Sequence, residues 1–439
     1  MRSNVAVGVL VAYTLCTGAV SSVAQAQRSG HCAVGSRVRA SAEMTIGATM
    51  LNGRPQQGGY LTEGYVTRPV VSLAASSACD VVSGHLELNL EGLTLLRGEL
   101  NPGIYGEGYY DRRHPHTLFH DAVATMRTSG DASSRARMSV TAGRGFAPFG
   151  TDDPMSRPFL KFPTNHHLAQ LLERVVAIGA VGIPIDRRAD LAIEAGLFNG
   201  DDPIGPFAAP QWRRFSDSWS TRATIAVRRS ASAIEVQGSY ADVRSPDIPR
   251  GGGLDQRKTS VSARLEDRSS PLQRYVLAEF ATTSVYDGAT PAFEYSTWLA
   301  EGSLRRGRRE LALRVERTDR PEDERQLDPF RSPRPPHDFM NLGITRWSTA
   351  STRLSDSSTP LLAGVKVSLT SFVEAAIASP RQRLTGSLFD PQSFYGRSRI
   401  WTVTIGARFG IGSTAHARMG RYGAAAVPSV SGGVAHDHM

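Results

Sequence analysis

The chain has 439 residues, of which 40% are hydrophobic, and its formal net charge of +9 comes almost entirely from arginine. Nowhere after residue 26 do about 18 apolar residues follow one another, so no membrane-spanning helix is predicted there. No basic cluster alternates with aromatic residues, which argues against nucleic acid as a partner.

The first 26 residues have the pattern of a secretory signal peptide. Arg2 precedes the apolar run VAVGVLVAYTL (5–15), and Ala24-Gln25-Ala26 is a small-x-small cleavage site. We expect cleavage after Ala26 and export, with an uncleaved anchor helix as the alternative. In an exported protein Cys32 and Cys79 predict one disulfide, and two free thiols are the alternative.

The dominant signal in the rest of the chain is alternation of apolar and polar residues with a period of two. Residues 401–409, for example, place Trp401, Val403 and Ile405 opposite Thr402 and Thr404. Strict alternation of this kind predicts strands with one apolar and one polar face. Clear strands are predicted at 85–91, 219–228, 260–266, 310–316, 365–370 and 401–409, and weaker ones at 37–50, 60–74, 116–128, 134–142, 168–182, 188–198, 232–243, 273–285, 293–305 and 339–350.

The lengths and connections of these strands predict a transmembrane antiparallel β-barrel with up-and-down topology and about 14–18 strands. Many are about ten residues long, which is the length that a tilted strand needs to cross a bilayer. Short polar turns (228–232, 267–271, 305–309) alternate with long connections rich in Pro, Gly and charge (245–256, 319–338, 379–398). We therefore expect a signal peptide (1–26), a barrel (27–410) and a flexible C-terminal tail (411–439).

Aromatic residues near the ends of the predicted strands suggest an interfacial girdle. They are Trp219, Tyr240, Tyr275, Tyr286, Phe293, Tyr295, Trp347, Phe372 and Trp401. If the apolar faces meet lipid, the polar faces line the lumen, and the arginines on those faces set its electric field. These candidate pore-lining residues are Arg222, Arg264, Arg314 and Arg408.

The stretch GRGFAPFGTDDPMSRP (143–158) predicts a break in the ladder of strands. Gly143 and Gly145 permit unusual backbone angles, and three prolines prevent regular pairing. Such a segment can fold inward and narrow a pore. Its charged residues then become constriction candidates: Arg144, Asp152, Asp153 and Arg157. The alternative is an ordinary loop with an Asx turn.

The histidines upstream and downstream of this stretch form a weak candidate metal site. His114, His116 and His120 share one face of an extended chain, and His166 and His167 could join them, with Asp111 or Asp121 as a possible carboxylate ligand. Imidazole suits zinc, copper or nickel. Pro115 makes the local strand irregular, so structural or loop roles are the alternative, and no cofactor is otherwise expected.

Two stretches resemble bacterial outer-membrane proteins. IWTVTIGARF (400–409) is similar to the closing strand of such barrels, although residues 410–439 follow its terminal Phe409. GRGFAPFGTDDPMSRPFLKFP (143–163) resembles porin-like proteins with distant similarity to phosphate-selective porins, and the match extends from DRRHPHT (111–117) to NHHLAQ (165–170). The resemblance implies an outer-membrane location, assembly by the barrel-assembly machinery, and a barrel whose size is compatible with a homotrimer.

These observations predict a non-enzymatic channel for passive diffusion of small hydrophilic solutes, anions among them, across the bacterial outer membrane, in contact with its lipid. The alternatives are a metal-binding barrel, a lipid-hydrolysing barrel and a soluble β-protein. The enzymatic alternative needs a nucleophile, and no GxSxG motif marks one.

Overall fold

The protein is described by a computed structural model that covers residues 37–52, 60–77, 81–95, 116–128, 136–152, 154–164, 166–203, 205–246, 249–269, 271–323, 341–362, 364–383, 390–412 and 420–426. The predicted signal peptide, Cys32 and Cys79 lie outside the described residues, so cleavage and disulfide pairing stay predictions.

The described residues form a barrel wall of 16 strands. These are β1 (Arg37–Leu51), β2 (Leu61–Ser76), β3 (Val82–Asn89), β4 (Phe119–Arg127), β5 (Arg137–Gly145), β6 (Arg174–Pro184), β7 (Ala189–Phe198), β8 (Ser218–Arg228), β9 (Ser232–Val243), β10 (Asp255–Asp267), β11 (Leu272–Asp287), β12 (Thr290–Arg306), β13 (Arg309–Asp323), β14 (Asn341–Ser358), β16 (Val365–Gln382) and β17 (Ile400–Gly412). The predicted fold class and strand number are therefore confirmed.

Few other elements are present in the described part of the chain, and all are short. They are the two-residue strand β15 (Leu361–Leu362), the helices α2 (Glu91–Thr94), α3 (His166–Ala169) and α4 (Pro391–Tyr395), and the 3-10 turns η2 (Pro154–Ser156), η3 (Pro249–Gly251) and η4 (Gly423–Ala425). None of the described helices is both long enough and apolar enough to span a membrane.

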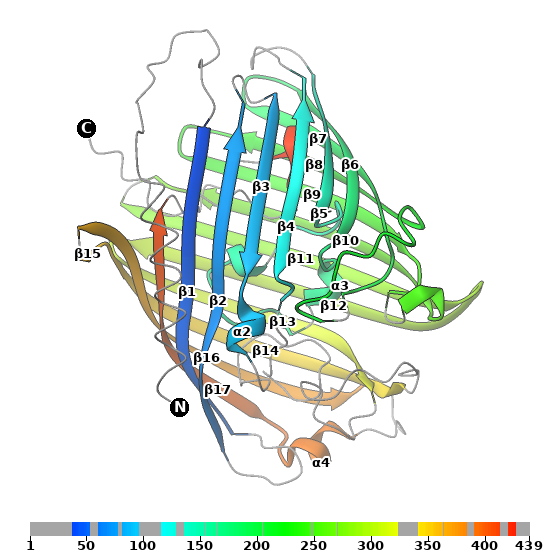
Figure 1. The fold of residues 1–439 in the computed structure, drawn as a ribbon. Helices are drawn as coiled ribbons and strands as arrows, with labels where there is room; N and C mark the ends of the chain where they lie inside the picture. The colour runs from blue at the N-terminus through cyan, green and yellow to red at the C-terminus, as the bar shows by residue number, and fades with distance from the viewer. Residues whose placement is uncertain are drawn as a thin grey trace.

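The wall is closed and antiparallel throughout (Figure 1). Each strand pairs with the next in the chain, except that β14 pairs directly with β16 because β15 belongs to the turn between them. The first and last strands also pair, from Ser41 opposite Gly412 to Leu51 opposite Thr402. Closure leaves no edge with unpaired backbone groups, as a sheet in lipid requires.

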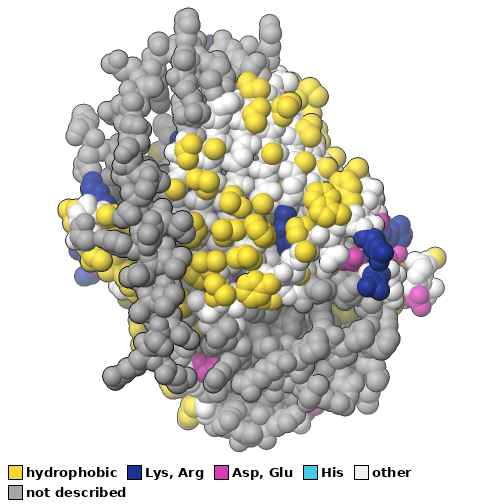
Figure 2. All heavy atoms as spheres, viewed as in Figure 1, with side chains coloured by type: hydrophobic (Ala, Val, Ile, Leu, Met, Phe, Trp, Pro, Cys, Tyr) yellow, Lys and Arg dark blue, Asp and Glu magenta, His cyan; other side chains and the backbone are white. Residues whose placement is uncertain are grey.

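Alternation along each strand places the apolar side chains outside and the polar ones inside. On β8, Trp219, Ile225 and Val227 are exposed, whereas Arg222 and Thr224 are buried. Figure 2 shows many apolar side chains on the outer surface of the viewed wall. This polarity is the reverse of that of a soluble protein and is what a barrel surrounded by lipid needs.

The connections differ between the two ends of the barrel. At one end, here called the turn end, β8 and β9 are joined through residues 229–231 and β12 and β13 through residues 307–308. At the other, the loop end, β5 and β6 are joined through residues 146–173 and β7 and β8 through residues 199–217. The alternation of short and long connections is as predicted, apart from β11 and β12, which are joined at the loop end by residues 288–289.

Two predictions need correction. The strand predicted at 168–182 begins only at Arg174, because α3 precedes it. Four residues assigned to the aromatic girdle are instead buried and point into the lumen: Tyr275, Tyr295, Trp347 and Phe372. An exterior aromatic group does exist at the loop end, where the rings of Trp219 and Tyr240 lie 5.3 Å apart.

Two short parts of the predicted tail (411–439) are described. Strand β17 continues to Gly412, and residues 420–426 are packed inside the barrel against β4–β7 (Figure 1, red). Arg421 and Tyr422 are both buried and bind side chains of the wall. The flexibility of the tail stays a prediction.

Candidate functional site

The centre of the lumen is occupied by the connection between β5 and β6, residues 146–173, here called the inward segment; residues 153 and 165 within it lie outside the described part. It leaves the wall after Gly143, whose φ of 145° only glycine adopts easily. A Cβ atom at Gly143 would lie 2.2 Å from the carbonyl oxygen of Ala122 on β4. The predicted ladder break therefore lies where the glycines indicated, and the segment turns into the barrel.

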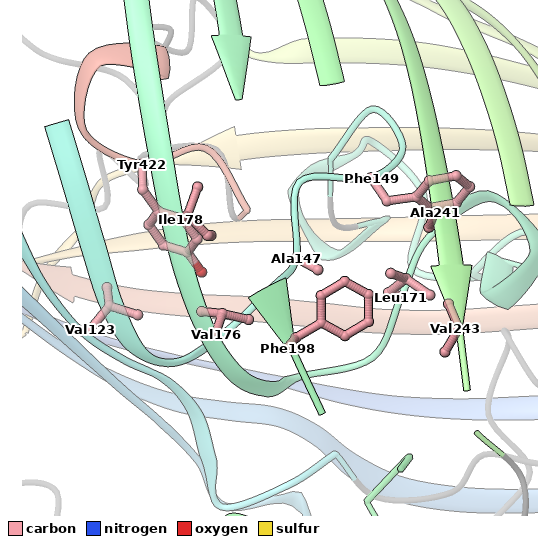
Figure 3. Close-up of a cluster of buried hydrophobic side chains, with 10 residues drawn as sticks. All are labelled: Val123, Ala147, Phe149, Leu171, Val176, Ile178, Phe198, Ala241, Val243 and Tyr422. Atoms are coloured by element: carbon pink, nitrogen blue, oxygen red, sulfur yellow. The ribbon is translucent and has the colours of Figure 1, made fainter. Parts of the chain in front are cut away.

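Apolar residues of the inward segment pack against the inner surface of the wall. Ala147, Phe149 and Leu171 form one buried cluster with side chains of β4, β6, β7 and β9 and with Tyr422 (Figure 3). The wall residues in this cluster are Val123, Val176, Ile178, Phe198, Ala241 and Val243. Burial of these side chains fixes the segment against one side of the lumen.

Glutamates from the opposite side of the wall bind backbone amides of the inward segment. Glu374 on β16 accepts hydrogen bonds from the amides of Leu160 and Lys161 at 2.9 and 2.8 Å. Glu316 on β13 accepts one from the amide of Thr164 at 2.8 Å. The segment thus crosses the lumen from β5 to the wall around β13–β16, held by charge-assisted hydrogen bonds at its far end.

Arginines of the wall bind backbone carbonyls of the same segment. The donors are Arg68 on β2, Arg222 on β8, Arg314 on β13 and Arg353 on β14. Arg314 donates to the Lys161 carbonyl at 2.6 Å, and Arg353 donates to the Pro158 carbonyl at 2.5 Å. Because these arginines bind backbone carbonyl oxygens, they position the inward segment independently of the identity of its side chains.

Two of the constriction candidates, Asp152 and Arg157, form an ion pair. Arg157 Nε lies 3.3 Å from Asp152 Oδ1, and Arg157 Nη2 lies 3.0 Å from Glu279 Oε2 on β11. Asp152 also pairs with Arg264 on β10. Burial lowers the pKa of Arg157, but the surrounding carboxylates of Glu279, Asp152 and Glu301 raise it well above its usual value. These buried ion pairs connect the inward segment to β10 and β11.

The other constriction candidates lie elsewhere. Arg144 is directed to the loop-end connection, where it donates to the Ala208 carbonyl at 3.4 Å, and it makes no described contact with Asp152. Asp153 lies outside the described residues.

All four predicted pore-lining arginines face the inside of the barrel, and each is paired with a carboxylate. Arg222 pairs with Glu194, Arg264 with Asp152 and Glu266, Arg314 with Glu301, and Arg408 with Glu43. The side chains of the first three are almost fully buried, whereas that of Arg408 is 34% exposed. The glutamate partners were not predicted, although their positions in the alternating pattern of each strand mark them as inward.

The candidate metal ligands are brought only partly together. His116 Nδ1 lies 2.7 Å from Glu91 Oε2, and His120 lies between Glu87 (3.0 Å) and Glu173 (3.2 Å). His114 lies outside the described residues, as do the side chains of His166 and His167, whose backbone belongs to α3. Within the described residues no group of three or more His, Cys, Asp or Glu could hold a metal ion.

His120 joins Glu87 on β3 to Glu173 of the inward segment, and His116 contacts Glu91 of α2. Burial raises the pKa of Glu173, but His120 and His116 lower it by more, so the pKa is below its usual value. The rings of His116 and His120 lie 5.1 Å apart, and His116 also packs against Phe162 at 5.6 Å. The described geometry is that of histidine–carboxylate contacts inside the barrel, and the metal site stays a prediction.

The similarity of this chain to known proteins lies in its fold and not in its sequence. No protein family and no curated protein matches the sequence. Among solved structures, the anion-selective porin from Comamonas acidovorans has a TM-score of 0.51 at 10% identity, covering 86% of this chain and 100% of that chain. The trimer form of OmpT from Vibrio cholerae has a TM-score of 0.49 at 9% identity, covering 86% and 99% of the two chains. The outer membrane channel DcaP of Acinetobacter baumannii has a TM-score of 0.48 at 10% identity, covering 87% and 99%.

At such low identity, the similarity to the Comamonas acidovorans porin is evidence for the fold alone. It agrees with the closed antiparallel wall. The chain has the fold of the bacterial outer-membrane porins.

Proposed function

We propose that the protein is a porin-like channel for passive diffusion of small hydrophilic solutes across the bacterial outer membrane. The observation that carries the proposal is the polarity of the closed wall. Arg222 and Arg314 are among the largest fully buried side chains, whereas Leu313 and Val373 are exposed at 58% and 47%. An apolar outer surface matches lipid, and a charged inner surface matches water and polar solutes.

In this proposal, the inward segment is the part of the channel that selects among solutes. It crosses the lumen and is tied to opposite sides of the wall, so a solute has to pass beside it. Beside it, the accessible pair of Arg408 with Glu43 presents both a donor and an acceptor to a passing solute. Such a lining favours small hydrophilic molecules over apolar ones.

A preference for anions is a finer part of the proposal. It is supported by the excess of arginine in the sequence and by the fold likeness to an anion-selective porin. The pairing of the lumen arginines with carboxylates works against a strong preference, because it cancels much of their field. We therefore propose weak anion selectivity. We also propose a homotrimer in the outer membrane, with which a barrel of 16 strands is compatible.

Liposome swelling tests the function. Vesicles containing the refolded protein are diluted into isotonic solutions of a pentose, a disaccharide and a trisaccharide. We expect swelling with the pentose and progressively less with the larger sugars, and none with heat-denatured protein. Absence of swelling with every solute, for both the full chain and a chain ending at Gly412, would contradict the proposal.

A further inference from the structure

Residues 420–426 are inserted between the wall and the inward segment near the turn end of the barrel. The 3-10 turn η4 contacts β4, β5, β6 and β7. The amide of Ala424 donates to Ser139 Oγ on β5 at 2.8 Å, and Ala425 is 1% exposed among the alanines of β6 and β7. A Cβ atom at Gly423 would lie 2.1 Å from Ser139 Oγ, so the fit at this point admits only glycine.

The centre of this insertion is Arg421, whose side chain is fully buried. Its Nη2 lies 3.1 Å from Glu235 Oε1 on β9, and its Nη1 lies 3.7 Å from Glu194 Oε2 on β7. It donates to Thr224 Oγ1 on β8 at 2.6 Å and to the carbonyl oxygen of Thr151 at 3.0 and 3.1 Å. Every nitrogen of the guanidinium group therefore has an acceptor.

The wall around Arg421 carries two carboxylates and two guanidinium groups of its own. Arg222 is bound to Glu194 at 2.6 and 2.7 Å, and Arg264 is the direct cross-strand partner of Glu235. Arg421 adds a third cation that contacts both Glu194 and Glu235. Two carboxylates, a hydroxyl and a carbonyl oxygen around one planar group suit a guanidinium better than an ammonium group.

Tyr422 fixes the same segment to the start of the inward segment. Its hydroxyl donates to Asp121 Oδ2 on β4 at 2.9 Å and accepts the amide hydrogen of Phe146 at 3.0 Å. Together with the bonds from Arg421 to the Thr151 carbonyl, residues 420–426 hold both ends of stretch 146–151. Release of residues 420–426 would thus both empty the turn-end side of the lumen and free this part of the inward segment.

We propose that Glu194, Glu235, Thr224 and the Thr151 carbonyl form a guanidinium-binding site whose resident ligand is Arg421, so that residues 420–426 are an internal plug of the channel. The plugging role rests on the proposed channel function, whereas the binding site does not. A basic solute that carries a guanidinium group, such as arginine, is the chemical class that can compete for this pocket.

The binding site is tested with a labelling experiment that is independent of transport. Ala424 is replaced by cysteine in a chain whose Cys16, Cys32 and Cys79 are serine, and the rate of maleimide labelling of the folded barrel is measured. We expect Arg421→Ala to speed labelling about tenfold or more, the change that loss of a charged hydrogen-bonded pair produces. Glu235→Gln should act in the same direction. Arg229→Ala, at an exposed arginine of the turn between β8 and β9, is the control that should change nothing.

Chemical rescue tests the class of ligand. Guanidinium ion at tens of millimolar is expected to slow labelling of the Arg421→Ala variant back toward the wild-type rate, by filling the space left by the missing side chain. Equal labelling of wild type and Arg421→Ala would overturn the site, and equal protection by sodium and guanidinium would overturn its chemistry. Heat-dependent gel migration confirms that each variant is a folded barrel.

Channel recordings of the same proteins then test the plug. We expect larger or more frequent openings for Arg421→Ala than for wild type. Faster labelling with membranes that stay silent would overturn the plug and the proposed channel function, and would leave the guanidinium site standing. Faster labelling with openings like those of wild type would overturn the plug alone.

Discussion

Arg314 on β13 and Glu301 on β12 form an ion pair of 2.7 Å inside the barrel, and neither side chain has any exposed surface. The two residues are direct cross-strand partners. The same guanidinium donates to the Lys161 carbonyl, so one pair joins two wall strands to the inward segment.

Removal of one partner from this pair should be strongly destabilising. Glu301→Gln leaves the buried Arg314 without its carboxylate, and we expect the free energy of unfolding in lipid vesicles to fall by about 3–5 kcal/mol. The double variant Glu301→Leu with Arg314→Met should lose less than the single one, because it removes both charges. Urea titrations followed by tryptophan fluorescence provide the measurement; a double variant less stable than Glu301→Gln would contradict this interpretation.

Arg68 has an unusual backbone conformation and binds two carbonyl groups of the inward segment. It has a φ of 51°, lies in the register shift where β2 meets β1, and donates to the carbonyls of Leu160 (2.8 Å) and Met155 (3.3 Å). Arg68→Ala should cost about 1–3 kcal/mol by orphaning these carbonyls. Arg68→Gly loses the same hydrogen bonds but relieves the backbone, so it should be the more stable of the two by about 1 kcal/mol. The same urea titration compares them, and an alanine variant as stable as wild type would show that these bonds do not matter.

Gly143 should tolerate no side chain. A methyl group there would meet the Ala122 carbonyl at 2.2 Å, at a φ that alanine avoids. We expect Gly143→Ala to lower sharply the folded fraction, measured by heat-dependent migration on gels. Gly179→Ala is the matched control, because a Cβ atom at Gly179 would meet nothing within 4 Å. Equal folding of the two variants would refute the sharp turn into the lumen.

Tyr422 should resist ionisation. Burial, with the Asp121 carboxylate beside it, raises the pKa of Tyr422 well above its usual value of 10.0. A raised pKa in the folded state means that the docked state is favoured at neutral pH and loses this contribution as pH rises above 10. At about pH 11 the phenolate absorbance of folded wild type and of Tyr422→Phe should therefore be equal, and should differ by one tyrosine only after unfolding. A difference already present in the folded proteins would contradict the buried position.

Arg408 is the most accessible of the predicted lumen arginines. Its side chain is 34% exposed, so its charge should act on ions in the lumen despite its pairing with Glu43. We expect Arg408→Gln to shift the reversal potential in a salt gradient toward cation selectivity. Arg317→Gln, at an exposed outward position of β13, should leave it unchanged. Equal shifts, or none, would contradict a lumen field set by inward arginines.

The wall of the barrel could be predicted from the sequence because alternation is a local property. Within ten residues, Trp219, Ile225 and Val227 predict the lipid-facing side of β8, and the polar residues between them predict the side that faces the lumen. The same parity rule, applied strictly, would have placed Tyr275 inside, because it shares its face with Glu279, and Phe372 inside with Glu374. For these aromatic residues, position near a strand end predicted the side of the wall less reliably than parity did.

The contents of the lumen could not be predicted in the same way. Leu160 and Glu374 are separated by 214 residues and meet only because the barrel closes. Glycines and prolines marked where the chain leaves the wall, but they carry no information on which strands receive it. Arg421 lies between Gly420 and Gly423 in a stretch of flexible composition, and its partners come from three different strands.

Single-channel conductance in planar bilayers tests the central claim, that a lipid-facing wall encloses a path for water and ions, most directly. The account predicts discrete openings from the refolded protein, with larger or more frequent openings when the chain ends at Gly412. Uninterrupted silence from the full chain, the Arg421→Ala variant and the shortened chain, all folded in the same membranes, would contradict it.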